Sequence, residues 1–267
     1  MRRTTSICRF FAGQEICTTV DEYMDYSMHM PTTRAIALFV ETIRNALGFR
    51  RSIAKARQLE IPVVVCKVGR TEVSARQAFS HTGAIAGDSD TFDALLERYG
   101  AVKVDSLEQL LSTATLLSNP RKPSCEGFAM FTDSGGLCGL AGDRGATLGT
   151  NFTPLREETN KALKEPMPLS SPNNPLDAMS DDRYESEFMT IDAALEAHSV
   201  TDKPMFVLSS YTGFPQNRAM EKCRAADVPF IIGQDNALTA AKNFLSYPRA
   251  NDGELVTRHQ RGTFCRR

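Results

Sequence analysis

The chain has 267 residues, of which 42% are hydrophobic and 24% charged, and this near-average balance excludes collagen-like, coiled-coil and wholly disordered proteins. Its 31 basic and 32 acidic residues nearly cancel to a net charge of -1, which argues against a dominant nucleic-acid-binding or anionic-membrane surface. The longest aliphatic runs fall far short of the roughly 20 apolar residues of a membrane helix, and the chain start lacks the apolar stretch of a secretory signal.

Seven cysteines are scattered along the chain without a CxxC pair and without the spacing of a zinc site. We therefore expect neither a disulfide framework nor a bound metal, and we expect a reducing, cytoplasmic location. Neither a nucleic acid nor a membrane is expected among the partners.

Short apolar runs alternate with segments of helical period, the pattern of α/β units built on a parallel sheet. In chain order, the predicted strands are 35–41, 62–67, 101–104, 127–132, 204–209 and 228–232. The predicted helices are 49–58, 89–99, 107–117, 136–148, 156–164, 192–198, 216–226 and 237–245. Parallel strands separated by helices fit right-handed crossover connections.

Two irregular stretches interrupt this pattern. Prolines and polar residues break the periodicity at 118–124, which predicts a linker, and 166–182 is rich in Pro, Ser and Asn, which predicts a long loop within a second domain. We therefore predict a first domain at 1–118, a linker at 119–126, a second domain at 127–247 and a polar tail at 248–267.

Three predicted strands end in residues that can do chemistry, and ligands of open α/β sheets bind beyond the carboxyl ends of strands. Glu41 ends the first of these strands. Lys67 ends the next and is followed closely by Arg70. These two cations could face a bound anion or could be ordinary loop charges.

The third of these strands runs into Ser134, Gly135 and Gly136 and then into a predicted helix. Free backbone N–H groups and the positive end of the helix dipole favour phosphate or another anion there, and glycine permits a close approach. A tight glycine turn without a ligand explains the same residues equally well.

His81 lies among small residues in the run SHTGAIAG (80–87), which is typical of neither a helix core nor a strand. Small neighbours leave room for a ligand to reach the ring, although a loop histidine taken alone is more often an exposed or internally bonded side chain. The other three histidines have no such setting.

Residues 32–117 resemble the flavodoxin-like ligase domain of NDP-forming acyl-CoA synthetases, relatives of the succinyl-CoA synthetase alpha subunit. The resemblance rests on TTRAIALFVETIRN, IPVVVCKVGRTEVSARQAFSHTGAIAGDSDTFDALLERYG and VKVDSLEQLL. Residues 127–245 resemble the next flavodoxin-like domain of the same family through FTDSGGLCGLAGDRGATLG, NNPLDAM and VPFIIG. The resemblance implies an α/β fold of two flavodoxin-like parallel-sheet domains.

In this family, a histidine carries a phosphoryl group between an acyl phosphate and a nucleoside diphosphate. His81 matches that phosphohistidine, and Glu41, 40 residues earlier, matches its carboxylate partner. The chemistry needs a neutral imidazole with one nitrogen free to attack phosphorus. Residues 134–136 match a phosphate-cradling helix start, and Asp143 stands at a family-like position whose role the resemblance leaves open.

The resemblance also implies what the chain lacks. Residues 6–13 (SICRFFAG) resemble the second strand of the first domain, so that domain is expected to lack its N-terminal strand and helix. No run resembles a CoA-binding or ATP-grasp domain, and there is no P-loop and no GxGxxG. CoA, ATP or ADP and Mg²⁺ would therefore be bound mainly by partner domains or subunits. A truncated, split or frameshifted gene would explain both ends.

The leading hypothesis is the phosphohistidine-bearing portion of an ADP-forming acyl-CoA synthetase, inactive without its partner domains. The alternative is a non-catalytic regulatory or interaction module of the same ancestry. The family cradles phosphate with two helices, one from each flavodoxin-like domain, and the expected absence of the first favours this alternative. A third interpretation is an inactive relic, whose open sheet edge would favour aggregation or dimerisation; we expect an oligomer. These residues select neither the acid substrate nor ADP over GDP.

Overall fold

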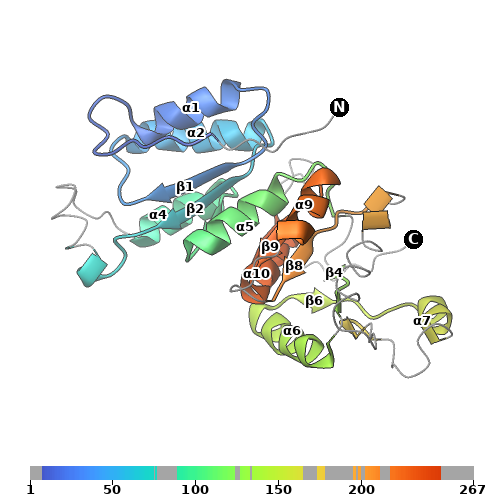
Figure 1. Ribbon diagram of the computed structural model, residues 1–267. Helices are drawn as coiled ribbons and strands as arrows, with labels where there is room; N and C mark the ends of the chain where they lie inside the picture. Colours follow the sequence, from blue (N-terminus) through green and yellow to red (C-terminus); the bar gives the residue numbers. More distant parts are fainter. Residues whose placement is uncertain are drawn as a thin grey trace. The chain divides into compact units, whose positions relative to one another are not determined.

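The computed structural model describes residues 8–74, 76, 89–123, 127–132, 134–164, 173–177, 195–196, 198–199, 202–210 and 217–247. These residues fall into two compact units, with the boundary between Ser118 and Asn119 and with Tyr247 assigned to the first unit. In both units, helices alternate with strands that pair in parallel (Figure 1). The predicted α/β class is therefore confirmed.

The first unit is built on a three-stranded parallel sheet. Its strands are β1 (Ile36–Val40), β2 (Val63–Lys67) and β3 (Val102–Val104), in the order β1-β2-β3. All five residues of β2 are buried, which explains why its sequence is an unbroken apolar run ending in a lysine. All three strands were predicted within two residues of their observed bounds.

Four described helices of this unit flank the sheet: α1 (Val20–His29), α2 (Ala46–Gln58), α4 (Ser89–Arg98) and α5 (Leu107–Leu117). Figure 1 shows α1 and α2 side by side over the same part of the sheet. Their apolar residues meet the strands in one core cluster, in which Phe49 and Ile53 are almost fully buried. Helix α5 contacts β1 and β2.

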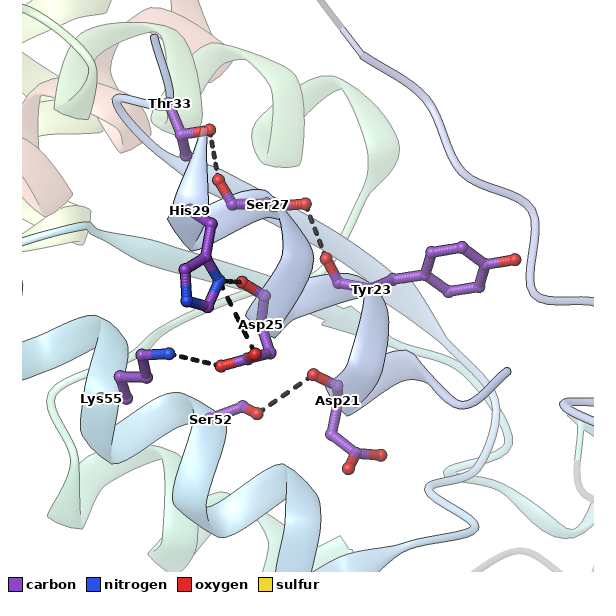
Figure 2. A network of polar contacts seen from close by, with 8 residues as sticks. All are labelled: Asp21, Tyr23, Asp25, Ser27, His29, Thr33, Ser52 and Lys55. Carbon is purple, nitrogen blue, oxygen red and sulfur yellow. Dashed lines mark hydrogen bonds and ion pairs between the residues drawn. The ribbon is translucent and has the colours of Figure 1, made fainter. Parts of the chain in front are cut away.

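Helix α1 is held to α2 by a polar network as well as by apolar packing (Figure 2). Lys55 Nζ lies 2.6 Å from Asp25 Oδ1, and Ser52 Oγ donates to the Asp21 carbonyl at 3.1 Å. His29 Nδ1 lies 2.7 Å from the Asp25 carbonyl. The hydrogen bond from Lys55 holds the pKa of Asp25 below its usual value.

The predicted strand at residues 6–13 is not formed in its described part, 8–13. Phe10 instead stacks on Tyr23 at a centroid distance of 5.0 Å and meets Tyr26 edge-on at 5.9 Å, so the segment packs against α1. A strand needs a hydrogen-bonding neighbour, and no described strand of the first unit pairs with this segment.

The described residues of the second unit form three parallel pairs of short strands. The strands β4 (Gly127–Phe128) and β6 (Asn151–Phe152) pair, as do β5 (Phe131–Thr132) and β7 (Leu176–Asp177), and β8 (Val207–Ser209) and β9 (Phe230–Ile232). The described helices are α6 (Gly135–Leu148), α7 (Glu157–Lys164), α9 (Asn217–Ala225) and α10 (Gln234–Ser246). Met130, Ala141 and Leu238 form one core cluster between these elements.

The single strand predicted at 127–132 is two short pieces, β4 and β5, because a side chain takes the place of a neighbouring strand between them. Asn174 Oδ1 accepts from the Met130 N–H at 3.0 Å, and Nδ2 donates to the carbonyls of Phe128 and Thr153 at 2.8 Å each. Asn174 and β7 lie in the segment predicted as one long loop (166–182). Residues 166–172 and 178–182 of that segment lie outside the described residues.

The predicted linker is described as far as Pro123 and has neither helix nor strand there. The Asn119 side chain accepts from the Arg121 N–H at 2.9 Å, and Lys122 Nζ donates to the Asn119 carbonyl at 2.9 Å. The predicted tail beyond Tyr247 lies outside the described residues. In the part of the chain that the structure covers, no helix is long and apolar enough to cross a membrane.

Candidate functional site

The carboxyl ends of β1 and β2 bring three of the predicted site residues to one edge of the first sheet. The strands are parallel, and Val40 stands opposite Lys67 in the register. Glu41, which follows β1, and Arg70, which follows β2, therefore leave the sheet at the same edge. The sequence prediction that these residues gather at one end of the sheet follows from parallel pairing alone.

Lys67 is a buried cation that fixes the backbone at this edge. Only 7% of the residue is exposed, and Nζ donates to the Glu41 carbonyl at 3.2 Å and to the Val68 carbonyl at 3.1 Å. The ammonium also lies 5.6 Å from the centre of the Phe92 ring. Burial, together with the nearby charge of Arg70, lowers the pKa of Lys67. Lys67 therefore joins the ends of β1 and β2 and holds the main chain from which the Glu41 side chain projects.

Arg70 is paired within the protein. Its Nη2 lies 2.5 Å from Asp93 Oδ2, and Lys103 Nζ lies 2.6 Å from the same oxygen. Burial alone would raise the pKa of Asp93, but the hydrogen bonds from Lys103 and Arg70 outweigh burial and lower the pKa. Asp93 Oδ1 is buried without a hydrogen-bond partner. Asp93 was missed from the sequence because nothing local signals that α4 meets the end of β2.

His81 lies outside the described residues, as does the whole run 77–88 around it. The structure describes both flanks of this run: the end of β2 precedes it, and α4 begins directly after it at Ser89. The pairing of His81 with Glu41 therefore stays a prediction, for which the described residues supply the carboxylate and its anchored backbone.

In the second unit, the predicted glycine turn is the start of α6. Ser134 is the N-cap, and its Oγ accepts a hydrogen bond from the Leu137 N–H at 3.4 Å. Gly135 and Gly136 are exposed and form the first two residues of the helix. The N–H groups of a first helical turn have no partner within the helix, and the helix dipole adds positive charge there. This geometry can hold an anion.

An acidic side chain lies against that helix start. Because β7 runs parallel to β5, Asp177 stands opposite Thr132 in the register, at the end where α6 begins. A Cβ on Gly135 would come within 2.9 Å of Asp177 Oδ2, so the glycine leaves room for this carboxylate. Burial, with the Asp177 charge adding to it, raises the pKa of the Cys138 thiol one turn later.

Gln234, the first residue of α10, is hydrogen-bonded to the first turn of α6. It is 7% exposed, follows β9 after one glycine, and donates from Nε2 to the Leu137 carbonyl at 3.2 Å. Its Oε1 is buried without a hydrogen-bond partner. Neither Gln234 nor Asp177 was predicted from the sequence as a site residue, although NNPLDAM, which contains Asp177, is part of the resemblance.

Asp143 is exposed on α6, eight residues after Gly135. At a rise of about 1.5 Å per residue it lies about 12 Å along the axis from the helix start, so it does not join the glycine turn. Within the described residues, no group of three or more His, Cys, Asp or Glu side chains is arranged to hold a metal ion.

Residues 8–117 match the family described as succinyl-CoA ligase like flavodoxin domain. The ADP-forming acetate–CoA ligase I of Archaeoglobus fulgidus is 31% identical over 170 residues, which cover 63% of this chain and 24% of that protein. The alpha subunit of the ADP-forming acetate–CoA ligase II of Pyrococcus furiosus is 28% identical over 180 residues, which cover 67% of this chain and 39% of the subunit. A trans-feruloyl-CoA synthase is 28% identical over 179 residues, which cover 67% of this chain and 25% of that protein.

The fold comparison agrees with the sequence comparison. The acetyl-coenzyme A synthetase 1 of Ca. Korarchaeum cryptofilum, solved with phosphate and ADP, superposes with a TM-score of 0.69 over 88% of this chain and 57% of that chain, at 22% identity. The chain thus matches about a quarter to two fifths of the length of these curated relatives. Relatives named for acetate and for ferulate match at similar identity, so overall similarity does not select an acid.

Proposed function

The chain belongs to the family of NDP-forming acyl-CoA synthetases, and on this premise we propose that it supplies the phosphohistidine centre of such an enzyme. The overall reaction converts an acid, CoA and ATP to an acyl-CoA, ADP and phosphate. The observation that carries the proposal is the anchored edge of the first sheet: the buried Lys67 ammonium fixes the Glu41 main chain at the carboxyl end of β1.

The proposed step at His81 is a phosphoryl transfer in which one bond replaces another. In the direction from ATP, a neutral imidazole nitrogen attacks the terminal phosphorus, a P–N bond forms, the P–O bond to ADP breaks and ADP leaves. The ring then carries a positive charge, which the Glu41 carboxylate stabilises while it orients the other nitrogen. In the next step, an acid oxygen takes the phosphoryl group and the imidazole is released unchanged.

The phosphoryl group carries about two negative charges at neutral pH and needs hydrogen-bond donors. The proposed donors lie at the start of α6, at Ser134, Gly135 and Gly136. One helix start contributes only about 0.3–1 kcal/mol at an exposed site and up to about 2 kcal/mol when partly buried. The start of α6 alone is therefore weak, and a second donor group from a partner is part of the proposal.

CoA and ATP are proposed to bind to partner domains or subunits, because this chain covers only part of each relative. The relatives of Pyrococcus furiosus named as alpha subunits support a division of such an enzyme between chains. Mg²⁺ typically binds through phosphate oxygens and a few carboxylates, and is proposed to arrive with the nucleotide on a partner domain.

The proposal is tested by reconstitution. The chain is mixed with separately produced CoA-binding and ATP-grasp domains of the Archaeoglobus fulgidus relative, and ADP release is measured with acetate and CoA. ADP release is expected to exceed that of the added domains alone, to vanish with His81→Ala and to persist with His198→Ala.

Glu41→Gln is expected to slow ADP release at least tenfold, because the imidazolium loses its counter-charge, whereas Glu157→Gln on the exposed face of α7 serves as the matched control. Full ADP release by the His81→Ala chain, or no release above the added domains with the unaltered chain, would overturn the proposal.

A further inference from the structure

Glu41, Lys67 and Arg70 lie at one edge of the first sheet, yet neither cation forms an ion pair with the carboxylate. Lys67 Nζ is bonded to main-chain carbonyls, those of Glu41 and Val68. Burial lowers the pKa of Lys67 and the charge of Arg70 lowers it further, so the guanidinium lies near the ammonium. No ion pair joins Glu41 to any residue that the structure describes. Something must therefore keep Arg70 from pairing with Glu41.

Asp93 on α4 is the residue that holds Arg70. Arg70 Nη2 and Lys103 Nζ lie 2.5 and 2.6 Å from the same oxygen, Asp93 Oδ2. Only 28% of the Arg70 side chain and 27% of the Asp93 side chain are exposed, so this pair is screened less by water than a surface pair. Although burial raises the pKa of Asp93, the hydrogen bonds from Lys103 and Arg70 lower it overall. The Asp93 carboxylate therefore keeps its charge at neutral pH.

We propose that Asp93 is a positioning residue that holds Arg70 away from Glu41, so that the Glu41 carboxylate stays available to the His81 ring. This inference rests on the proposed function, in which Glu41 orients the imidazole and stabilises its positive charge. A carboxylate that is already bonded to a guanidinium has fewer oxygen lone pairs left for a ring N–H, and its charge is largely neutralised. Asp93 thus acts on the reaction through Arg70 and does not itself contact the phosphoryl group.

The two cations that Asp93 holds differ in their position in the sheet. Arg70 follows β2, which is the neighbour of β1, whereas Lys103 lies in β3, which β2 separates from β1. In the register, Lys103 stands opposite Val65, two residues before the end of β2. Loss of the Asp93 charge is therefore expected to let Arg70, but not Lys103, pair with Glu41. Lys103 supplies a control within the same cluster of charges.

The first test is rescue by a second substitution. The full chain is mixed with ATP and the same partner domains, and phosphoryl incorporation is measured within one turnover. Asp93→Asn is expected to slow incorporation at least fivefold, because Arg70 then pairs with Glu41. Adding Arg70→Gln is expected to raise the rate of Asp93→Asn at least threefold, whereas adding Lys103→Gln is expected to leave it low. Glu97→Gln, at an exposed residue one turn later on α4, is the matched control for Asp93→Asn.

The direction of this result separates the proposal from two other roles of the cluster. If the ion pair only stabilised the fold, removing Arg70 as well as the Asp93 charge would not restore the rate. If Arg70 itself bound the phosphoryl group, Arg70→Gln alone would abolish incorporation, and the double variant would be as slow. Far-UV circular dichroism checks that each variant is folded.

The second test measures the pairing of Glu41 without catalysis. In urea titrations, Glu41→Gln is expected to leave the midpoint of the unaltered chain unchanged. In the Asp93→Asn chain, Glu41→Gln is expected to lower the midpoint by roughly 0.1–0.5 M, the size that one ion pair would give. Adding Arg70→Gln to the Asp93→Asn chain is expected to abolish this effect of Glu41→Gln.

Failure of this inference and failure of the proposed function are distinguishable. Incorporation that Arg70→Gln does not rescue, equal rescue by Lys103→Gln, or a midpoint shift from Glu41→Gln that does not depend on Asp93 would each overturn the inference and leave the phosphohistidine proposal intact. Absence of phosphoryl incorporation in the unaltered chain would overturn the proposed function, and with it the role of Asp93 in the reaction. The urea titrations would still decide whether Asp93 keeps Arg70 from Glu41.

Discussion

At the scale of single residues, Lys67 has the most consequential environment at the edge that carries Glu41. Its ammonium is nearly buried and is bonded to two carbonyls, and the nearby Asp93 carboxylate is already paired with Arg70. Burying a charge without a counter-charge is unfavourable unless hydrogen bonds compensate for lost hydration. Burial of the Lys67 ammonium therefore lowers the stability of the fold, while its two hydrogen bonds fix the backbone at the ends of β1 and β2.

Because the pKa of Lys67 is lowered, the contribution of this residue to the free energy of unfolding depends on pH, and the sign of that dependence is known. Between its folded pKa and the unfolded value of about 10.4, the unfolded chain binds more protons than the folded chain, so stability rises with pH. The free energy of unfolding of the unaltered protein, relative to that of Lys67→Met, is therefore expected to rise from pH 7 to pH 10 in urea titrations. Lys161→Met, on the exposed face of α7, is the control. A difference that stays constant or falls with pH would contradict this interpretation.

Among these residues, the sequence predicted which side chains lie at one edge of the sheet but not how their charges are paired. Glu41, Lys67 and Arg70 were predictable because parallel strands end at one edge. That Arg70 is bonded to Asp93, and that Lys67 is turned to the main chain, depends on where α4 packs. Contacts between elements far apart in the chain carry no local signal.

At the scale of elements, the start of α6 combines a helix dipole, two glycines and an adjacent carboxylate. The Asp177 carboxylate lies beside Gly135, the first residue of this helix. A Cβ added to Gly135 would meet this carboxylate at 2.9 Å, whereas one added to Gly136 would have only Ser134 Oγ nearby, at 3.7 Å. A side chain at position 135 would therefore be too close to Asp177, whereas one at position 136 would fit without a clash.

Substitution by alanine is therefore expected to change the stability of the protein by different amounts at Gly135 and Gly136. Gly136→Ala is expected to stabilise the protein by up to about 1 kcal/mol, because alanine is the better helix former and its methyl group meets only Ser134 Oγ, at an ordinary contact distance. Gly135→Ala is expected to gain less, because its methyl group must displace Asp177. In an Asp177→Ala background the two substitutions are expected to become equal in urea titrations. An equal gain in the unaltered background would contradict the placement of Asp177.

The element that the sequence analysis missed, α1, had a readable signal. Thr19 precedes it, and the Glu22 carboxylate accepts from the Thr19 N–H at 2.8 Å, the reciprocal half of a capping box. The spacing of threonine and glutamate was visible in the sequence. The strand that the resemblance implied at 6–13 was wrong in its described part for a different reason: a strand needs a hydrogen-bonding neighbour, and no described strand pairs with this segment.

At the scale of the whole molecule, each unit has its own core. Phe49 belongs to the cluster of the first unit and is 0% exposed, and Leu238 belongs to a cluster of the second and is also 0% exposed. The two clusters share no residue. The two units meet between Ser118 and Asn119. The predicted division into a first domain at 1–118 and a second at 127–247, each stable by itself, stays a prediction.

Independent cores predict separable unfolding. Phe49→Ala is expected to cost the first unit about 3–5 kcal/mol and Leu238→Ala to cost the second about 2–5 kcal/mol. Amide hydrogen exchange measures the protection of both units in one experiment. Phe49→Ala should speed exchange in β2 and leave β9 unchanged, and Leu238→Ala should speed exchange in β9 and leave β2 unchanged. Loss of protection in both units from either substitution would show a single cooperative fold.

The position of the phosphoryl group on the chain decides whether His81 is a phosphohistidine. The unaltered chain and the partner domains are mixed with ATP and quenched within one turnover, and the chain is digested under mildly alkaline conditions that preserve phosphohistidine. Tandem mass spectrometry is expected to place the phosphoryl group on His81, with its occupancy reduced by Glu41→Gln. A phosphoryl group on any other residue, or an unmodified His81 in a mixture that turns over, would contradict the phosphohistidine proposal.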